Sequence, residues 1–106
     1  MTGYNHGLSI AEMEAAMEPY GVPQHLRNGL ARYILHGIRP GGFLDALLVN
    51  DLRMSVHRAD AESLRAIPQV LEFLHWNAPS ACYGTPQRHD AWMERGGLLR
   101  MVEGCP

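Results

Sequence analysis

The sequence predicts an all-α protein, a compact bundle of about four to five short helices in a single domain of 106 residues. Three observations support this prediction. Apolar residues recur at spacings of three and four, which is the helical period. Residues that cap helices stand directly before these stretches, and proline or glycine follows them. No run of alternating apolar and polar residues indicates a strand.

The composition is that of an ordinary globular protein, with 46% hydrophobic and 19% charged residues. No apolar run approaches the roughly 20 residues that span a bilayer. The N-terminal residues 1–6 have neither the basic nor the apolar part of a signal peptide. We therefore expect a cytoplasmic protein without membrane contact.

The formal net charge of −2 argues against a general nucleic-acid binder, because such domains carry a basic face. All nine basic residues are arginine. This bias is explained either by the codon usage of a GC-rich genome or by a preference for planar donors that bind carboxylates and phosphates. Cys82 and Cys105 are far apart in the sequence, and we expect reduced thiols.

The first predicted helix runs from about Ile10 to Glu18. The segment Ser9-Ile10-Ala11-Glu12 is a capping box, in which serine and glutamate each satisfy a free backbone amide. Met13 and Met17 then fall on one face. Proline and glycine at positions 19–21 end the helix.

A second helix is predicted from Pro23, whose missing amide costs nothing at the first helical position. Gly37 fits the left-handed residue that ends such a helix, and Ile38 is expected to fold back on Tyr33. The predicted buried stripe consists of Leu26, Leu30, Tyr33 and Ile34.

The third predicted helix follows Pro40 and is apolar on nearly all sides as far as Val49. Asn50 and Asp51 interrupt it with adjacent polar groups, the apolar pattern then continues at lower density, and we expect the helix to end near His57 or Arg58. A helix of this kind belongs in the centre of a bundle or in a subunit interface. It therefore predicts a homo-oligomer.

Asp60 is expected to cap a fourth helix. Pro68 lies inside it and should kink it or split it into a short lead and a main body. Phe73 and Trp76 widen its apolar face. The predicted core stripe consists of Leu64, Ile67, Leu71 and Leu74.

A short fifth helix is predicted after Thr85 and Pro86, which fit a cap and a first helical residue. It presents His89, Trp92 and Met93 on one side and stops at residues 96–97. The terminal segments 1–8 and 97–106 are expected to be loosely ordered.

Few residues indicate catalysis or a metal site. No two of the six histidines are three or four residues apart, and the cysteines lack a metal-binding spacing, so we predict no metal and no cofactor. Cys82 lacks the basic setting that activates a nucleophile, and a thiol packed under a loop is expected. We predict no catalytic residue.

The turn Arg39-Pro40-Gly41-Gly42 is the candidate ligand site. Glycines let a backbone approach a ligand closely, free amides at a helix start favour an anion, and Arg39 adds a charged donor. Asn50 and Asp51 would add polar contacts one to two turns along, and Trp76 or Tyr83 would cover a base. A turn that only redirects the chain, and aromatic residues that only close the core, are the plainer interpretation.

The segment Gly37-Ile38-Arg39-Pro40-Gly41-Gly42-Phe43-Leu44, followed by Asn50-Asp51-Leu52, resembles a group of short proteins encoded by tailed bacteriophages and prophages. The resemblance covers about residues 26–95. Tyr83 stands where the group has tryptophan, and Pro68 interrupts a helix that is expected to be regular. The matching features further along are Ala59-Asp60, Asn77-Ala78-Pro79, Tyr83-Gly84-Thr85-Pro86 and Trp92.

The resemblance implies a small accessory phage protein in the bacterial host cytoplasm, without an assigned activity. Our hypothesis is a non-catalytic, homo-oligomeric binding protein that captures and neutralises a host protein or an anionic, nucleotide-like molecule. The alternatives are a small hydrolase or nuclease that uses Asp and His, and a structural or regulatory phage protein. An enzyme would need acid–base residues clustered in one cleft, whereas a binder needs only donors and stacking surfaces.

Overall fold

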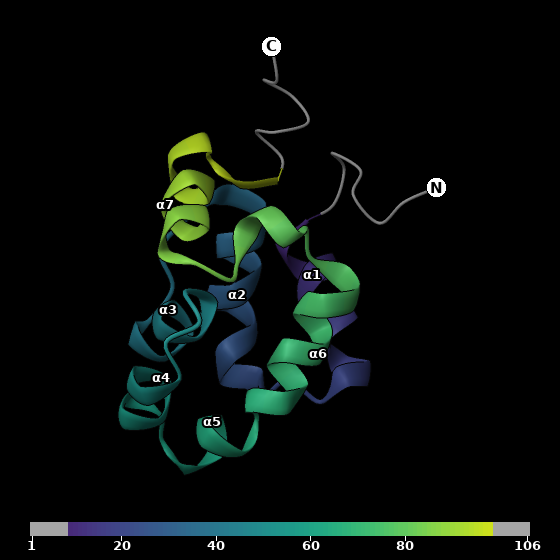
Figure 1. Ribbon diagram of the computed structural model, residues 1–106. Coiled ribbons are helices and arrows are strands. Elements are labelled where there is room, and N and C mark those ends of the chain that lie inside the picture. The colour runs from purple at the N-terminus through teal and green to yellow at the C-terminus, as the bar shows by residue number, and fades with distance from the viewer. Residues whose placement is uncertain (1–8, 99–106) are drawn as a thin grey trace.

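A computed structural model describes residues 9–98 of the chain. The predicted loose segment 1–8, residues 99–106 and Cys105 lie outside the described residues. Residues 9–98 form helices and no strand, which confirms the all-α prediction, with more helices than expected (Figure 1). The elements are α1 (Ile10–Met17), η1 (Glu18–Tyr20, 3₁₀), α2 (Gln24–His36), α3 (Gly42–Leu48), α4 (Leu52–Arg58), α5 (Ala61–Arg65), α6 (Ile67–Asn77), η2 (Ser80–Cys82, 3₁₀) and α7 (Pro86–Arg95).

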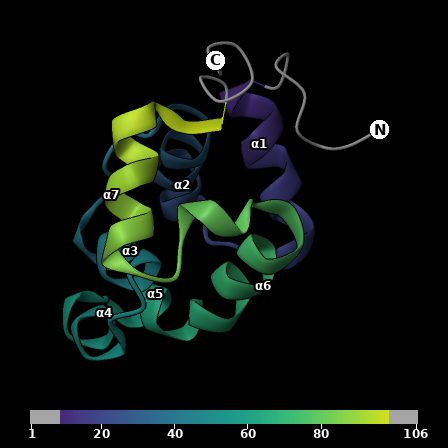
Figure 2. The same ribbon diagram turned by 45° about the horizontal axis from the view of Figure 1, so that its top comes forward.

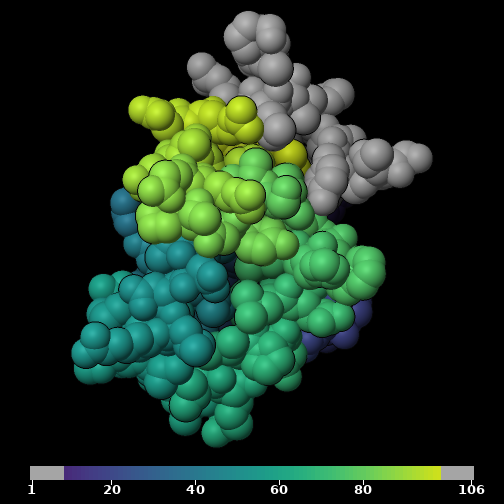
Figure 3. Space-filling view, viewed as in Figure 1, coloured from purple at the N-terminus to yellow at the C-terminus, as the bar shows by residue number. Residues whose placement is uncertain are grey.

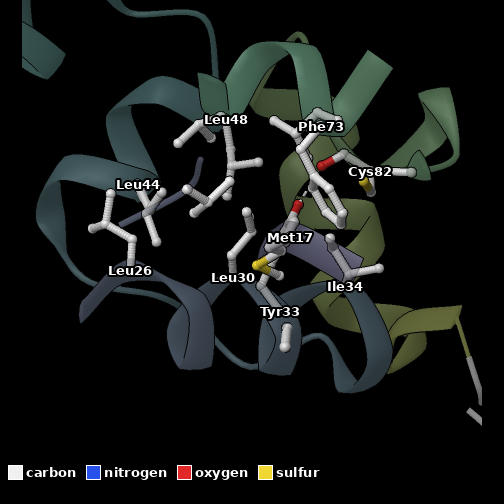
Figure 4. Packing of buried hydrophobic residues seen from close by; sticks show 14 of the residues in the cluster. Met17, Leu26, Leu30, Tyr33, Ile34, Leu44, Leu48, Phe73 and Cys82 are labelled. Carbon is white, nitrogen blue, oxygen red and sulfur yellow. Dashed lines mark hydrogen bonds between the residues drawn. The ribbon is translucent and has the colours of Figure 1, made fainter. Parts of the chain in front are cut away.

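Helix α2 lies at the centre of the molecule. Helices α7, α3 and α4 lie on one side of it, and α1 and α6 on the other (Figures 1 and 2). Its C-terminal half is fully buried at Leu30 and from Tyr33 to Leu35. The core therefore forms around this helix, where Leu30 and Tyr33 meet Leu48 of α3 and Phe73 of α6 (Figure 4). Among residues 9–98, no helix has both the length and the apolar character to cross a membrane.

The first two helices agree with prediction at most positions. Both hydrogen bonds of the capping box are present, at 3.1 Å from the Glu12 amide to Ser9 Oγ and 2.9 Å from the Ser9 amide to the Glu12 carboxylate. Helix α1 ends one residue earlier than predicted because the chain tightens into η1. The predicted stripe of α2 is buried, and Gly37 is left-handed with φ of 68°. Ile38, however, is 41% exposed.

The predicted third helix is wrong in its length. It breaks into α3 and α4 at Asn50, which adopts a left-handed φ of 69°. Asparagine tolerates this conformation better than most residues. Asp51 then caps α4, because its carboxylate accepts a hydrogen bond of 3.1 Å from the amide of Met54. The two polar residues that interrupt the predicted helix therefore form the boundary between two helices.

Helix α3 is covered by its own chain. Five of its seven residues are buried, namely Phe43, Leu44, Ala46, Leu47 and Leu48. The apolar surface of α3 therefore needs no second subunit to cover it. The exposed apolar residues of this region lie on α4 instead, at Leu52 and Val56. Homo-oligomerisation stays a prediction, and it needs another surface.

Replacement of Leu47 by alanine is expected to lower the free energy of unfolding by about 2–5 kcal/mol, because a buried leucine leaves a cavity. Urea denaturation followed by circular dichroism measures the change. Leu64→Ala is the matched control, since Leu64 is 43% exposed and should cost less than about 1 kcal/mol. Equal costs for the two variants would contradict the placement of α3.

The predicted fourth helix is split into α5 and α6, as Pro68 suggested. Asp60 caps α5 through a 2.7 Å bond from the Ser63 amide, which lowers the pKa of Asp60. The core stripe was wrong at Leu64 and Leu71, which are 43% and 42% exposed. The Ala66 amide donates to the Ser63 carbonyl, three residues back, whereas a regular α-helix bonds four residues back. This tighter turn changes which of the following residues face the core. The buried residues of α6 are Val70, Phe73 and Leu74, whereas Trp76 is 64% exposed.

Helix α7 follows its prediction closely. Thr85 Oγ1 accepts a hydrogen bond of 3.1 Å from the Arg88 amide, and Pro86 is the first helical residue. His89 and Trp92 are buried. Gly96 ends the helix with a φ of 90°.

Long-range hydrogen bonds join α2 to the last third of the described chain. The Tyr33 hydroxyl donates to the carbonyl of Cys82, and the Trp92 indole donates to the Tyr33 carbonyl at 2.9 Å. The Cys82 side chain is buried, as expected of a thiol under a loop. Burial raises the pKa of this thiol to about 12, so it is protonated at neutral pH.

Candidate functional site

The turn before α3 does not present a free guanidinium. Arg39 is 60% exposed, and its Nη1 donates to Oδ2 of Asp45. The other oxygen of Asp45 lies 2.7 Å from Nε2 of His89. These three side chains therefore link the turn to α3 and α7.

The His89 side chain is buried against the ring of Tyr33. It is 2% exposed, and its ring lies 5.1 Å from that of Tyr33 at a tilt of 33°. The sequence pattern placed His89 on one side of the helix with Trp92 and Met93 but did not indicate its partner. The two residues of the Asp45–His89 pair are 44 positions apart, and no local pattern connects them.

The Arg39–Asp45–His89 chain borders a small cleft between α3, α4 and α7, with a volume of about 140 Å³. Its charged lining consists of Arg39, Asp45, Asp51, Arg58 and Asp90. Acid–base groups are thus clustered here, as the hydrolase alternative requires. Each oxygen of the Asp45 carboxylate is bound, one by Arg39 and the other by Nε2 of His89, and the His89 side chain is 2% exposed. The pair links α3 to α7.

The two glycines of the turn lie in a neighbouring cleft of about 290 Å³. Arg58 contacts Gly42, and its Nη1 donates to the Gly42 carbonyl at 3.3 Å. Helix α3 begins there without a side-chain cap. Gly41 and Gly42 line this cleft and Arg39 does not, so the predicted anion site is divided between two clefts that share Arg58.

The other predicted site residues are scattered. Asp51 lines the small cleft but also caps α4. Asn50 is exposed at the helix break. Trp76 lies on α6, where its indole donates to Glu72 at 3.0 Å. Tyr83 is half-buried and packs against the core. Neither aromatic residue lines the clefts that contain Arg39 or the two glycines.

A larger groove runs along α7, beside η2, and its volume is about 440 Å³. Helix α7 and the η2 segment lie side by side (Figures 1 and 2). The lining residues are Ser80, Ala81, Gln87, Arg88, Ala91, Trp92 and Arg95. This α7 groove thus has two arginines, two alanines and no acidic residue in its lining.

Both arginines of the α7 groove are positioned by contacts. Nη1 of Arg88 lies 3.3 Å from the Ser80 carbonyl and 3.5 Å from the Tyr83 carbonyl. The Arg95 guanidinium lies 5.9 Å from the centre of the Trp92 ring. Neither arginine makes a salt bridge within residues 9–98.

Sequence reasoning missed this groove, although part of the signal was available. Arg88 and Arg95 are seven residues apart, or two turns of one helix face. The opposite wall at η2 depends on tertiary structure. Among residues 9–98, no group of three or more His, Cys, Asp or Glu side chains is arranged to hold a metal ion. No family model, curated protein or solved structure matches the chain.

Proposed function

We propose that the protein is a non-catalytic binding protein that captures a small anionic molecule in the α7 groove. The observation that supports the proposal is the pair of arginines without acidic neighbours in the lining. Guanidinium groups bind phosphate and carboxylate through two parallel hydrogen bonds. The volume of about 440 Å³ falls within the roughly 300–1,000 Å³ typical of small-molecule sites.

A nucleotide has the two properties that the α7 groove favours. Its phosphate suits Arg88 and Arg95, and its base suits the apolar part of the lining, which includes Ala81 and Ala91. The small cleft suits an anion less well, because three aspartates line it against two arginines. The anionic ligand that we expected from the sequence is therefore proposed at residues other than Arg39.

A binder fits this groove better than a hydrolase does. The lining of the α7 groove contains no histidine or carboxylate that could move a proton or activate the Ser80 hydroxyl. From the resemblance to phage accessory proteins we also propose a biological role. In that setting the captured molecule is a signalling nucleotide of the bacterial host, and its removal from solution is the function.

We predict that calorimetry against a panel of cyclic and linear nucleotides finds a ligand, and that Arg95→Gln weakens its binding about 10- to 100-fold. A charge-assisted hydrogen bond contributes roughly 1.5–3 kcal/mol, and each 1.4 kcal/mol corresponds to about tenfold in affinity. Arg95 is the better residue to replace, because Arg88 also bonds backbone carbonyls.

Arg39→Gln is the matched control, since it removes the same charge from the small cleft. Circular dichroism shows that both variants are folded. If binding weakens in Arg39→Gln and not in Arg95→Gln, the ligand site lies at the turn before α3 and not in the α7 groove. If no nucleotide and no inorganic phosphate binds the wild type, anion capture is refuted and a protein partner takes its place.

A further inference from the structure

Helix α4 buries a polar residue and exposes apolar ones. Of its seven residues only Ser55 is buried, and its hydroxyl donates to the Asp51 carbonyl at 2.7 Å. The apolar Leu52 and Val56 are 66% and 46% exposed. A helix with a buried serine and an exposed leucine departs from the usual pattern, in which apolar residues are buried. Such departures are expected at functional surfaces.

The exposed residues of α4 form a continuous face. Leu52 and Val56 are four residues apart and therefore adjacent along the helix, and Arg53 and His57 form a parallel row beside them. Helix α4 packs against α3 and lies at the edge of the molecule, where Figure 3 shows it at the lower left. We call these four residues the α4 face.

The charges around the α4 face are complementary to one another. Helix α4 contains three basic residues and no acidic one, whereas Asp60 and Glu62 stand just after its C-terminal end. Both carboxylates are more than 60% exposed, at 66% and 63%. When two such helices pair in opposite directions, Arg53 of each copy lies near Asp60 and Glu62 of the other.

We propose that the α4 face binds the α4 face of a second copy of this chain, antiparallel and about a two-fold axis. A two-fold interface joins the same surface on both subunits and must be self-complementary. Leu52 and Val56 provide the apolar part of this surface, and Arg53 is complementary in charge to Asp60 and Glu62, which lie just beyond the α4 face. Stable interfaces bury roughly 800 Å² per partner. A helix of two turns supplies only part of that area, so the start of α5 takes part and the dimer is weak.

This inference is independent of the proposed function. None of the four residues of the α4 face lines the α7 groove, so pairing leaves the groove open. Loss of nucleotide binding would not affect the dimer, and loss of the dimer would not refute anion capture.

Sedimentation over a range of concentrations tests the inference on the full chain. The wild type is expected to shift from 11.8 kDa toward twice that mass as concentration rises. Leu52→Glu should hold the protein at the monomer mass throughout. Leu71→Glu is the matched control, since Leu71 is exposed on α6, and it should behave as the wild type. A wild type that stays monomeric, or a Leu52→Glu variant that still associates, overturns the proposal.

A charge exchange tests the antiparallel arrangement. Arg53→Glu should weaken association about tenfold or more, because it faces the acidic residues of the other copy. Adding Glu62→Arg to that variant should restore association. If the double variant stays as weak as Arg53→Glu, the antiparallel pairing is wrong.

Discussion

Replacement of Gly97 by alanine is expected to destabilise the protein by at least about 3 kcal/mol, a large share of the roughly 5–15 kcal/mol that folds a typical domain. Gly97 has a left-handed φ of 84°, and an added Cβ would lie 2.5 Å from backbone atoms of Leu35 and His36. The conformation costs an ordinary L-residue roughly 1–2 kcal/mol. The contact adds more, because backbone atoms cannot rotate away as side chains do.

The end of α2 and the chain after α7 are also close at Gly37. A Cβ on Gly37 would lie 2.9 Å from the Trp92 carbonyl and 3.0 Å from the Gly97 amide. The C-terminal end of α2 and the chain after α7 thus meet glycine to glycine. An alanine at position 97 must push these two ends apart and lose the packing between them.

Gly29→Ala is the control for this prediction. Its added Cβ would be 3.7 Å from Leu44 Cδ1, an ordinary contact, and Gly29 is inside α2. Alanine is better than glycine in a helix by up to about 1 kcal/mol, so this variant should be slightly more stable. Urea denaturation of both variants measures the difference. A Gly97→Ala protein within about 0.5 kcal/mol of wild type would refute the close crossing.

Trp92→Ala is expected to cost about 3–5 kcal/mol, the range for a large aromatic residue removed from a core. Trp92 is 1% exposed, and its indole donates to the carbonyls of Tyr33 and Ile34 at 2.9 and 3.2 Å. Both carbonyls belong to the last turn of α2, where a helix lacks donors of its own. Trp92→Phe should lie between alanine and wild type, because it keeps most of the volume and loses the donor.

The second tryptophan of the chain is the matched control. Trp76 is 64% exposed, and Trp76→Ala should cost less than about 0.5 kcal/mol. Denaturation followed by far-UV circular dichroism compares the variants without relying on tryptophan fluorescence. Similar costs at positions 76 and 92 would contradict the packing of α7 on α2.

The features that could be predicted from the sequence are those set by residues within four positions of one another. The capping box at Ser9, the caps at Asp60 and Thr85 and the left-handed Gly37 depend on local hydrogen bonds, and all four are present. The errors arose where one residue changed the phase of a longer pattern. Asn50 ends α3 with a left-handed φ, so the residues of α4 face differently from those of a continuous helix.

The candidate site was predicted less well, for the same physical reason. The prediction of an anionic ligand came from a local turn, but Arg39 is bound by Asp45 and the turn is divided between two clefts. The α7 groove needs η2 beside α7, which is a tertiary arrangement. The pair of Asp45 and His89 likewise depends on two helices that only the complete fold brings together.

The bonds from Tyr33 to Cys82 and from Trp92 to Tyr33 span 49 and 59 residues, and they constrain how the chain folds as it is synthesised. Helices α1 and α2 are neighbours in sequence and can pair while the ribosome is still adding residues. The carbonyls of Tyr33 and Ile34 at the C-terminal end of α2 can accept from the Trp92 indole only after α7 has emerged. Closure of that long loop is therefore the late step of folding. Until it occurs, the nascent chain exposes the surface that later becomes its core.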